Sequence, residues 1–541
     1  MIAKIVLFEA TGLSGKSVMF TSSGNLDNSF NDKVSSIVVV NGTWSLYKDG
    51  NFSGKRWEVR ANGGPDGDGV YPSYKDWSGD NDTISSVVIE RSRWMEENTE
   101  IHKKKLRNIC LPASHDSGTY SLTNTWTPAL SEELALAMNT LNSIAASIEA
   151  IPGIGAYIPN PAEWLIDAVT PTVKKLAKAT GRSIAQQLRD GIRGLDFRVY
   201  YNASDKQYYI WHTLMGSNMK DVLQDVADFL ASTAGEILYI TFGHYQEFSD
   251  AQVADFLQFV KDRLGMYAYK VKTNGNIIVN NPFERTYDEI LTQGNEPDSS
   301  GTGERRHSVV ILVNARYSTN SYQDDPPAAT RPPAASKGQV DPPAATQDQV
   351  DPPAATQGQV DPPMATQDKV FWPRDYSPPD LGENSESPAL YGFYSNTSDK
   401  NSAIAGQEVN LAKARERNLG FPLYMTLTPQ DDECAMIVTY GAADAIEELG
   451  LALMLVPVVG LTVGALLLAL AESLKITESM LPYKSLEELS DHLNEDLYVN
   501  VKHSFVDEYV PNEISMLYTD FAENTMDVSL VDLAIQLSHM S

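Results

Sequence analysis

Short runs in which apolar and polar residues alternate fill the first ninety positions of the chain. Four of them, Lys4–Phe8, Ser36–Val40, Trp44–Tyr47 and Ser86–Ile89, are separated by turns rich in Gly, Asn and Asp. Alternation with a period of two buries one face of each run, so these runs are predicted strands. Short strands joined by tight turns indicate a small all-β sandwich over residues 1–92.

The pattern changes after a charged segment without apolar periodicity, residues 93–105, which we assign as a linker. Beyond it, predicted strands alternate with helical stretches such as Met219–Leu230 and Asp250–Leu264, where apolar residues recur every three to four positions. Strands that alternate with helices predict an α/β barrel over residues 106–541. The predicted strands are 106–111, 193–200, 208–212, 236–243, 308–314, 389–394, 422–428 and 514–521.

Two apolar insertions, at about 124–182 and 441–480, depart from a minimal barrel. The second contains Leu449–Ala471, which has no charged residue and is long enough to span a bilayer. Predicted barrel strands flank this run and must join one sheet, and Pro457 and Gly460 divide it into two shorter helices. We therefore predict a helical hairpin packed against the first insertion, with a segment that dips into a membrane as the alternative.

A third insertion, at about 324–370, repeats a proline-rich decapeptide. Its copies include VDPPAATQDQ, VDPPAATQGQ and VDPPMATQDK. Paired prolines without a buried apolar face predict an extended, largely polyproline-II loop with no core of its own. A spacer is favoured over a recognition motif.

Charge and composition narrow the classes of function. The chain has 541 residues and a net charge of −29, from 71 acidic and 42 basic residues, which argues against nucleic acid as a partner and against general affinity for anionic bilayers. The two cysteines, Cys110 and Cys434, imply no disulfide framework. The N-terminal residues MIAKIVLFEATG lack the apolar region of a conventional signal peptide. We expect a monomer that acts at membrane surfaces, either in the cytoplasm or exported without a conventional leader.

The stretch LRNICLPASHDSGTY, residues 106–120, places a histidine and an aspartate directly after an apolar run. Pro112 ends that run, so His115 and Asp116 are expected on a loop past the end of a strand, where barrel enzymes carry their catalytic groups. A His–Asp pair alone is weak evidence, because such pairs occur by chance on surfaces. The hypothesis of a catalytic site therefore depends on partners further along the chain.

Those partners follow about eighty residues later, in GIRGLDFRVYYNASDKQYYIWHTLMG. Alternation over Leu195–Tyr201 places Asp196 and Arg198 on one face of a strand and apolar residues on the other. A second aromatic strand then ends at His212. Because an unpaired buried charge is strongly destabilising, a strand with two charges on its inner face is poorly explained as core packing. Two histidines, two aspartates and an arginine are thus expected to converge in one lumen.

Together these motifs resemble the phosphatidylinositol-specific phospholipase C X-domain family in its metal-independent bacterial form. The matching pieces are PASHDSGT, GIRGLDFRV, the second histidine and GEILYITFGHY at 235–245, and the resemblance covers most of the chain from about 106 to 540. It implies a TIM-type barrel, regular or distorted. It also implies a phosphodiesterase that cleaves a phosphatidylinositol at a membrane surface, giving diacylglycerol and an inositol cyclic phosphate without a catalytic metal.

The same resemblance implies a role for each site residue. His115 is the general base, His212 is the general acid, and Asp116 pairs with Arg198. Metal-dependent members carry an acidic residue where Arg198 stands, so its guanidinium takes the place of calcium. A base, an acid and a cation on the non-bridging oxygens are what this reaction requires. The remaining assignments are Asp196, which orients the acid, Asp520 in ISMLYTDF, which supports the first histidine, and His244, which binds substrate with Arg198.

Two other functions remain open for the barrel. One is a different lipid or glycerophosphodiester phosphodiesterase, which would need a metal held by paired carboxylates and is disfavoured by Arg198. The other is a pseudo-enzyme that binds lipid without cleaving it, and only an activity assay separates it from an enzyme.

The first domain repeats itself internally. NDKVSSIVV at 31–39 recurs as NDTISSVVI at 81–89, and Tyr47, Phe52 and Gly54 have the spacing Tyr-x4-Phe-x-Gly. This domain resembles the Greek-key βγ-crystallins, and the resemblance implies a structural calcium site at each repeat, since oxygen donors suit calcium. One Asn-Asp pair could simply form a turn, but two copies in register favour calcium. The candidate ligand-bearing residues are Asn31, Asp32, Ser35, Asn81, Asp82 and Ser85.

Overall fold

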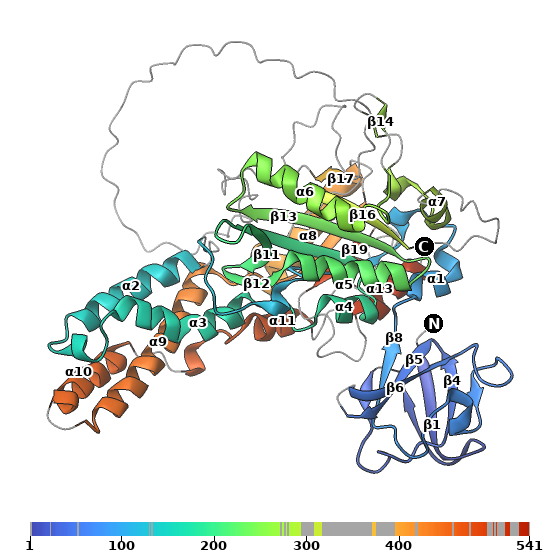
Figure 1. Ribbon diagram of the computed structural model, residues 1–541, viewed down its shortest axis with the longest axis horizontal. Helices are drawn as coiled ribbons and strands as arrows, with labels where there is room; N and C mark the ends of the chain where they lie inside the picture. The colour runs from blue at the N-terminus through green and yellow to red at the C-terminus, as the bar shows by residue number, and fades with distance from the viewer. Residues whose placement is uncertain are drawn as a thin grey trace.

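Figure 1 shows the computed structural model, in which a small β-domain precedes a larger α/β domain with a long helical arm. The structure describes residues 3–293, 308–315, 371–374 and 395–539, except for short stretches within these ranges. The excepted stretches are 22, 51–52, 129, 131–133, 271–272, 275–276, 279–280, 417–419, 457–458, 475–477, 495–500, 502–504, 506–513 and 520–529.

The β-domain is a sandwich of two four-stranded sheets, ordered β2-β1-β4-β7 and β3-β8-β5-β6. The two halves of the sequence exchange one strand each, because β3 joins the sheet of β5, β6 and β8, while β7 joins that of β1, β2 and β4. Ile5, Ile37, Trp44 and Val87 are buried between the sheets. The predicted all-β sandwich is therefore confirmed. Its strands are β1 (Lys4–Ala10), β2 (Ser14–Phe20), β3 (Gly24–Asn25), β4 (Ser36–Asn41), β5 (Thr43–Asp49), β6 (Ser53–Arg60), β7 (Val70–Tyr71) and β8 (Ser86–Glu90).

The segment that follows the sandwich differs from the linker predicted at 93–105. It forms the single helical turns α1 (Trp94–Glu97) and Thr99–Ile101, and its apolar side chains are buried against barrel strands. Single turns are too short to show a helical period, which is why the sequence pattern missed them. The segment therefore packs as part of the larger domain.

Among the residues that the structure describes, seven strands of the larger domain pair in parallel, in the order β17-β16-β13-β10-β9-β19-β18. Along β13, Ile237 and Tyr239 face one apolar cluster, while Leu238 and Ile240 face another. This two-sided burial is typical of an α/β barrel sheet, and the predicted fold class is confirmed. The strands are β9 (Leu111–Ser114), β10 (Gly194–Asn202), β13 (Ile237–Gln246), β16 (Val309–Ala315), β17 (Phe371–Arg374), β18 (Phe421–Met425) and β19 (Ile514–Thr519).

Two strand predictions differ from the structure, and a third cannot be compared with it. The first barrel strand is β9, not 106–111, where Leu106–Asn108 form a 3-10 turn. The predicted strand 208–212 forms β11 (Gln207–His212), which pairs antiparallel with β10 and β12 (Leu214–Asn218) and so lies outside the parallel order. The prediction at 389–394 lies outside the described residues.

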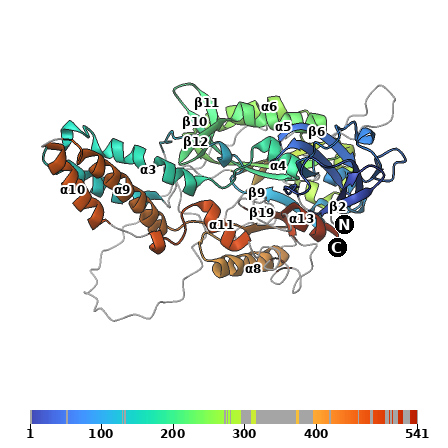
Figure 2. The same cartoon turned by 90° about the horizontal axis from the view of Figure 1, so that it is seen from below.

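Helices cover the outer face of the sheet (Figures 1 and 2). Ser249 caps α6 with its hydroxyl, and Asn218 caps α5 with its side-chain carbonyl, so both helices begin at polar residues that satisfy free N–H groups. The two helical predictions at these positions are confirmed. The helices around the sheet are α4 (Ile184–Asp190), α5 (Met219–Ser232), α6 (Asp250–Leu264), α7 (Tyr287–Gln293), α8 (Lys400–Glu416), α11 (Leu486–Asn494) and α13 (Leu530–His539).

The last helix, α13, returns to the junction between the two domains. Asp532 pairs with Arg91 (2.8 Å), directly after the sandwich. Ser538 Oγ accepts a hydrogen bond from the main-chain N–H of Cys110 (2.9 Å), just before β9. His539 also forms an ion pair with Glu100. Residues near position 100 and residues near position 535 thus form one packed unit.

The two apolar insertions form the arm, which consists of α2 (Ala135–Glu149), α3 (Pro161–Ala177), α9 (Asp431–Leu453) and α10 (Val459–Ser473). It projects from the barrel in Figures 1 and 2. Helix α9 packs on α2, α3 and α10, so the predicted contact between the insertions is present. The repeats at 324–370 lie outside the described residues. The stretch Gly460–Met480 is long and apolar enough to cross a membrane by length and composition, and 33% of its most apolar window is buried.

Candidate active site

His115 and Asp116 occupy a tight loop at the C-terminal end of β9. The main-chain N–H of His115 donates to the carbonyl of Thr519 on β19 (3.2 Å), and that of Ser117 donates to the carbonyl of Asp196 on β10 (2.9 Å). The loop is therefore tied to both strands that flank β9. Asp116 has a φ of +43°, a left-handed conformation that residues other than glycine rarely adopt. Backbone strain of this kind is concentrated at functional sites.

Pro112 lies inside β9 without disrupting the sheet. Its carbonyl accepts a hydrogen bond from the main-chain N–H of Arg193 (2.8 Å). Proline lacks an N–H and cannot donate to a neighbouring strand, but its carbonyl can still accept, and that is the contact Pro112 makes here. The strand consequently continues two residues past Pro112, and His115 follows its end directly.

Strand β10 presents its two charged side chains to the inside of the sheet, as the alternating pattern predicts. Its neighbours Leu195, Phe197 and Val199 are fully buried in the outer cluster of the core, under the helices. Asp196 and Arg198 are partly buried on the opposite face. The strand therefore brings a carboxylate and a guanidinium to the end of the barrel where the His115 loop lies.

Asp116 connects three side chains that the sequence motifs had singled out. Its Oδ1 lies 2.5 Å from Arg198 Nε, and its Oδ2 lies 3.6 Å from His115 Nε2 and 3.7 Å from His212 Nδ1. Burial by itself would raise the pKa of Asp116, but the charges of Arg198 and then of the histidines hold this pKa well below its usual range. Asp116 is thus an anion at the centre of a cluster of cationic and titratable groups.

His212 lies at the end of β11, and a helix of the arm fixes its ring. Its Nδ1 is 2.7 Å from the carbonyl oxygen of Ala177, the last residue of α3. A carbonyl can only accept, so Nδ1 carries the hydrogen in this contact. The proton that His212 can exchange is therefore the one on Nε2.

His244 lies near the end of β13 in a left-handed conformation, with a φ of +47°. Its carbonyl accepts a hydrogen bond from the indole N–H of Trp211 (2.8 Å). Burial, and then the charge of Arg198, lowers the pKa of His244 well below its usual value, so its imidazole is neutral. A neutral imidazole can hydrogen-bond a substrate without adding positive charge to the site.

Three of these groups could also hold a metal ion. One ligand atom each from His115, Asp116 and Asp196 lies within 4.8 Å of the others. Imidazole nitrogen and carboxylate oxygen are ordinary metal ligands. Asp116, however, is already paired with Arg198, whose fixed positive charge repels a cation at the same carboxylate. A metal ion at this grouping would therefore compete with the guanidinium of Arg198 for the carboxylate of Asp116.

One predicted site residue cannot be placed, and one functional contact had no signal in the sequence. Asp520 lies outside the described residues, and Thr519 beside it is the last residue of β19. The contact between Ala177 and His212 was not predicted, because it uses a main-chain carbonyl that any residue supplies. Only the helical pattern of the first insertion points to α3, and that pattern gives no position for its end.

The two Asn-Asp motifs of the sandwich interlock across its pseudo-symmetric halves. Ser35 Oγ lies 2.9 Å from Asn81 Oδ1 and 3.1 Å from Asp82 Oδ1, and Ser85 Oγ lies 3.1 Å from Asp32 Oδ1. Asp32 and Asp82 have nearly equal left-handed conformations, with φ of +55° and +53°. Each site therefore combines the serine of one motif with the aspartate of the other.

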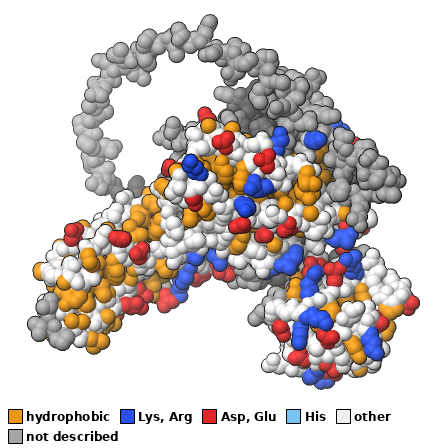
Figure 3. Space-filling view, in the orientation of Figure 1, with side chains coloured by type: hydrophobic (Ala, Val, Ile, Leu, Met, Phe, Trp, Pro, Cys, Tyr) orange, Lys and Arg blue, Asp and Glu red, His pale blue; other side chains and the backbone are white. Residues whose placement is uncertain are grey.

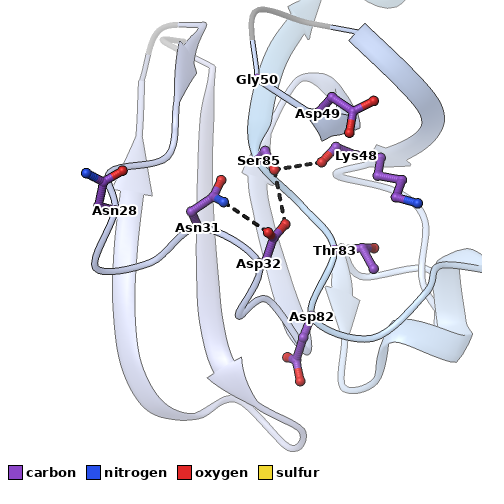
Figure 4. Close-up of a pocket in the computed structure, with 9 residues that line it drawn as sticks. All are labelled: Asn28, Asn31, Asp32, Lys48, Asp49, Gly50, Asp82, Thr83 and Ser85. Atoms are coloured by element: carbon purple, nitrogen blue, oxygen red, sulfur yellow. Dashed lines mark hydrogen bonds between the residues drawn. The ribbon is translucent and has the colours of Figure 1, made fainter.

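Side-chain and main-chain oxygens line a pocket of about 540 Å³ beside Asp32 and Ser85 (Figure 4). Asp32, Asp49 and Asp82 line it, together with the main chain around Lys48, whose carbonyl accepts a hydrogen bond from Ser85 (2.6 Å). Carboxylate, hydroxyl and carbonyl oxygens are the donors that calcium takes in flexible geometry. The residues present thus fit a calcium ion.

Comparison with known proteins gives a different relative for each domain. A family model described as Beta/Gamma crystallin matches residues 4–89. A beta/gamma-crystallin from Ciona intestinalis is 39% identical to this chain over 88 residues, which are 16% of this chain and 96% of that protein. The sandwich is therefore similar to that protein over nearly its whole length.

The larger domain is similar in sequence to proteins that contain a PI-PLC X domain. One from Dictyostelium discoideum is 28% identical over 155 residues, which are 28% of this chain and 21% of that protein. The chain thus spans about a fifth of that relative's length. Among solved structures, phosphatidylinositol-specific phospholipase C from Listeria monocytogenes matches with 12% identity and a TM-score of 0.39, covering 83% of this chain and 98% of that one.

Proposed function

We propose that this chain, which belongs to the β/γ-crystallin family through residues 4–89, is a phosphodiesterase of the phosphatidylinositol-specific phospholipase C type. One observation carries the proposal: the buried carboxylate of Asp116 lies beside His115 on its own loop, Arg198 on β10 and His212 at the end of β11. A barrel that needed only a stable core would not gather these groups, because burying them costs desolvation free energy.

The reaction proceeds by attack of a neighbouring hydroxyl of the inositol ring on phosphorus. His115 accepts the proton of that hydroxyl as its oxygen forms the new P–O bond. The bond from phosphorus to the glycerol oxygen breaks, and His212 donates the Nε2 proton to this leaving oxygen. The products are an inositol cyclic phosphate and diacylglycerol, and both protons are accounted for.

Arg198 stabilises the charge that develops on the non-bridging phosphate oxygens. Its guanidinium is held by Asp116, does not lose its proton near neutral pH, and has a planar set of donors that matches two oxygens at once. Asp116 also stabilises the imidazolium form of either histidine through charge. Asp196 orients the general acid, and His244 is a neutral group that hydrogen-bonds the substrate.

The experiment is turnover of phosphatidylinositol and of a soluble inositol phosphodiester by the purified protein. Because a positioned acid or base contributes about a hundred- to ten-thousand-fold in rate, His115→Ala and His212→Ala should each lose at least that much while melting like the wild type. Asp255→Ala, at an exposed position on α6, is the control. Wild-type turnover by either site variant, or no turnover by the wild type, would refute the proposal.

For the sandwich we propose two structural calcium sites. Asp32 and Ser85 would contribute to one, and Asp82 and Ser35 to the other, with main-chain oxygens near Lys48 completing the first. Bound calcium would neutralise facing carboxylates and link the two halves of the sandwich. It would supply stability to this domain and no step of the phosphodiester chemistry.

A further inference from the structure

The far end of the arm carries a concentration of exposed apolar side chains. Of the twelve exposed large apolar residues in the described part of the chain, six lie between positions 451 and 466, which we call the tip. Leu455, between α9 and α10, is 85% exposed. Figure 3 shows apolar side chains gathered over this end of the molecule. The six residues are Leu451, Met454, Leu455, Val456, Leu461 and Leu466.

From this surface we infer that the tip docks on the surface of a lipid bilayer with neutral, zwitterionic headgroups. The exposed apolar side chains of the tip lie on the end of α9, on residues 454–456 that follow it and on α10, and a fluid bilayer can cover all of them at once. No charged residue occurs from Leu449 to Ala471. Apolar side chains of this kind are buried at the boundary between headgroups and acyl chains when a protein lies on a membrane.

The backbone of the turn is already suited to an apolar medium. The main-chain N–H groups of Met454, Leu455 and Val456 donate to the carbonyls of Gly450, Ala452 and Leu453, at 3.1, 3.3 and 2.9 Å. Unsatisfied backbone groups exclude most loops from lipid. This turn carries its own hydrogen bonds, so those three N–H groups need no water.

The distribution of charge selects neutral lipid. Glu447, Glu448 and Glu472 are exposed just below the tip and would be repelled by anionic headgroups. The acidic body of the protein lies further away, since α9 has 23 residues and spans about 34 Å at the helical rise. That distance is several times the screening length of about 8 Å at physiological salt. The arm thus lets an acidic protein touch a membrane by an uncharged contact.

The test is flotation of the full chain with phosphatidylcholine vesicles. The wild type should float with the vesicles, in low and in high salt alike, because the contact is apolar. Leu455→Glu should bind at least about tenfold more weakly, since it loses a buried leucine and places a charge at the interface. Met266→Glu is the matched control, because Met266 is 80% exposed after α6, away from the tip. Its binding should equal that of the wild type.

Several results would overturn the inference. They are a wild type that stays unbound, equal loss in both variants, binding that requires added anionic lipid, and dimers of the free protein that Leu455→Glu abolishes. The inference is independent of the proposed reaction, because flotation needs no turnover. Cleavage of a soluble inositol phosphodiester by Leu455→Glu should match the wild type, so a failed membrane contact and a failed catalytic assignment give different results.

Discussion

At the scale of single residues, Asp116 determines the electrostatics of the proposed catalytic centre. It is buried, it is held in a left-handed conformation, and it pairs with the arginine while facing both histidines. Removing a carboxylate from such a cluster leaves cations facing one another. The effect of its substitution should therefore depend on pH in a defined direction.

The folded-state pKa of Asp116 lies below its unfolded value near 3.8. Its contribution to the free energy of unfolding is thus present above that value and is lost as the pH falls below it. Asp116→Asn should lower the melting midpoint of the barrel at pH 7, and the gap to the wild type should begin to narrow only below about pH 4 and keep narrowing toward the still lower folded-state pKa. Thermal unfolding across this range is the measurement. Asp255→Asn, an exposed position on α6, should show no such gap, and a gap independent of pH would contradict the role of Asp116.

Arg198 should replace a metal in the chemical step. A chelator should leave cleavage of a soluble inositol phosphodiester unchanged, whereas Arg198→Ala should lose about a hundred- to a thousand-fold, the usual effect of removing a donor to a developing anion. Arg263→Ala, a surface arginine on Phe259 of α6, is the control. A strict requirement for divalent metal would instead assign the chemistry to an ion at the grouping of His115, Asp116 and Asp196.

The residues that face one another through side chains could be predicted from the sequence. Alternation along β10 placed Asp196 and Arg198 on one face, and the position of His115 after an apolar run placed it on a loop at a strand end. The partner of His212 could not be predicted. It is a main-chain carbonyl at the end of a helix in an insertion, and residue type does not encode such a contact.

At the scale of elements, the strand predictions succeeded where alternation or apolar runs were long. Helix α6 was predicted with its observed bounds, because its cap and its period agree. The first barrel strand was predicted too early in the chain, at 106–111. Proline usually ends a strand, and the sequence does not show that the carbonyl of Pro112 pairs with Arg193, the residue before β10. Strand β11 was predicted as a strand, but its antiparallel pairing with β10 depends on the geometry of the turn between them.

Helices α9 and α10 approach closely where Gly450 of α9 faces Gly464 of α10. A Cβ at Gly464 would lie 2.6 Å from the carbonyl oxygen of Gly450, so the helices could not remain this close. Gly464→Ala should lower the stability of the arm by about 1–3 kcal/mol, the usual effect of overpacking. Faster amide hydrogen exchange in α9 and α10 would report this change.

Another glycine of the arm provides the control for that experiment. A Cβ at Gly155 would meet no atom within 4 Å, so Gly155→Ala should leave exchange in both helices unchanged. Equal exchange in Gly464→Ala and the wild type would show that the helices do not depend on this close contact.

At the scale of the whole molecule, the two domains should respond differently to calcium. An ion that binds only the folded sandwich adds about 2.7 kcal/mol to its free energy of unfolding at a hundredfold excess over Kd. Scanning calorimetry of the full chain should therefore show the transition of the sandwich move upward with calcium, while the transition of the barrel stays in place. Replacing both Ser35 and Ser85 by Ala should weaken this shift without unfolding the domain.

The control for the calcium experiment is the chemistry of the barrel itself. Cleavage of the soluble substrate should be equal with calcium and with chelator, in the wild type and in the double variant alike. If millimolar calcium does not move the unfolding transition of the sandwich, the Asn-Asp motifs are turn formers and not calcium sites.

The contact of α13 with the domain junction sets an order in time. Arg91 and Asp532 are 441 positions apart, so a chain that grows from its N-terminus can complete the sandwich long before the partners of Arg91, Glu100 and Cys110 exist. Contacts this distant in sequence are slow to form, because a long loop must be closed first. The loop of His115 and Asp116 follows β9, and α13 holds the residue just before β9 through the hydrogen bond between Cys110 and Ser538. The nascent protein should therefore bind calcium early and gain phosphodiesterase activity only after its last helix has docked.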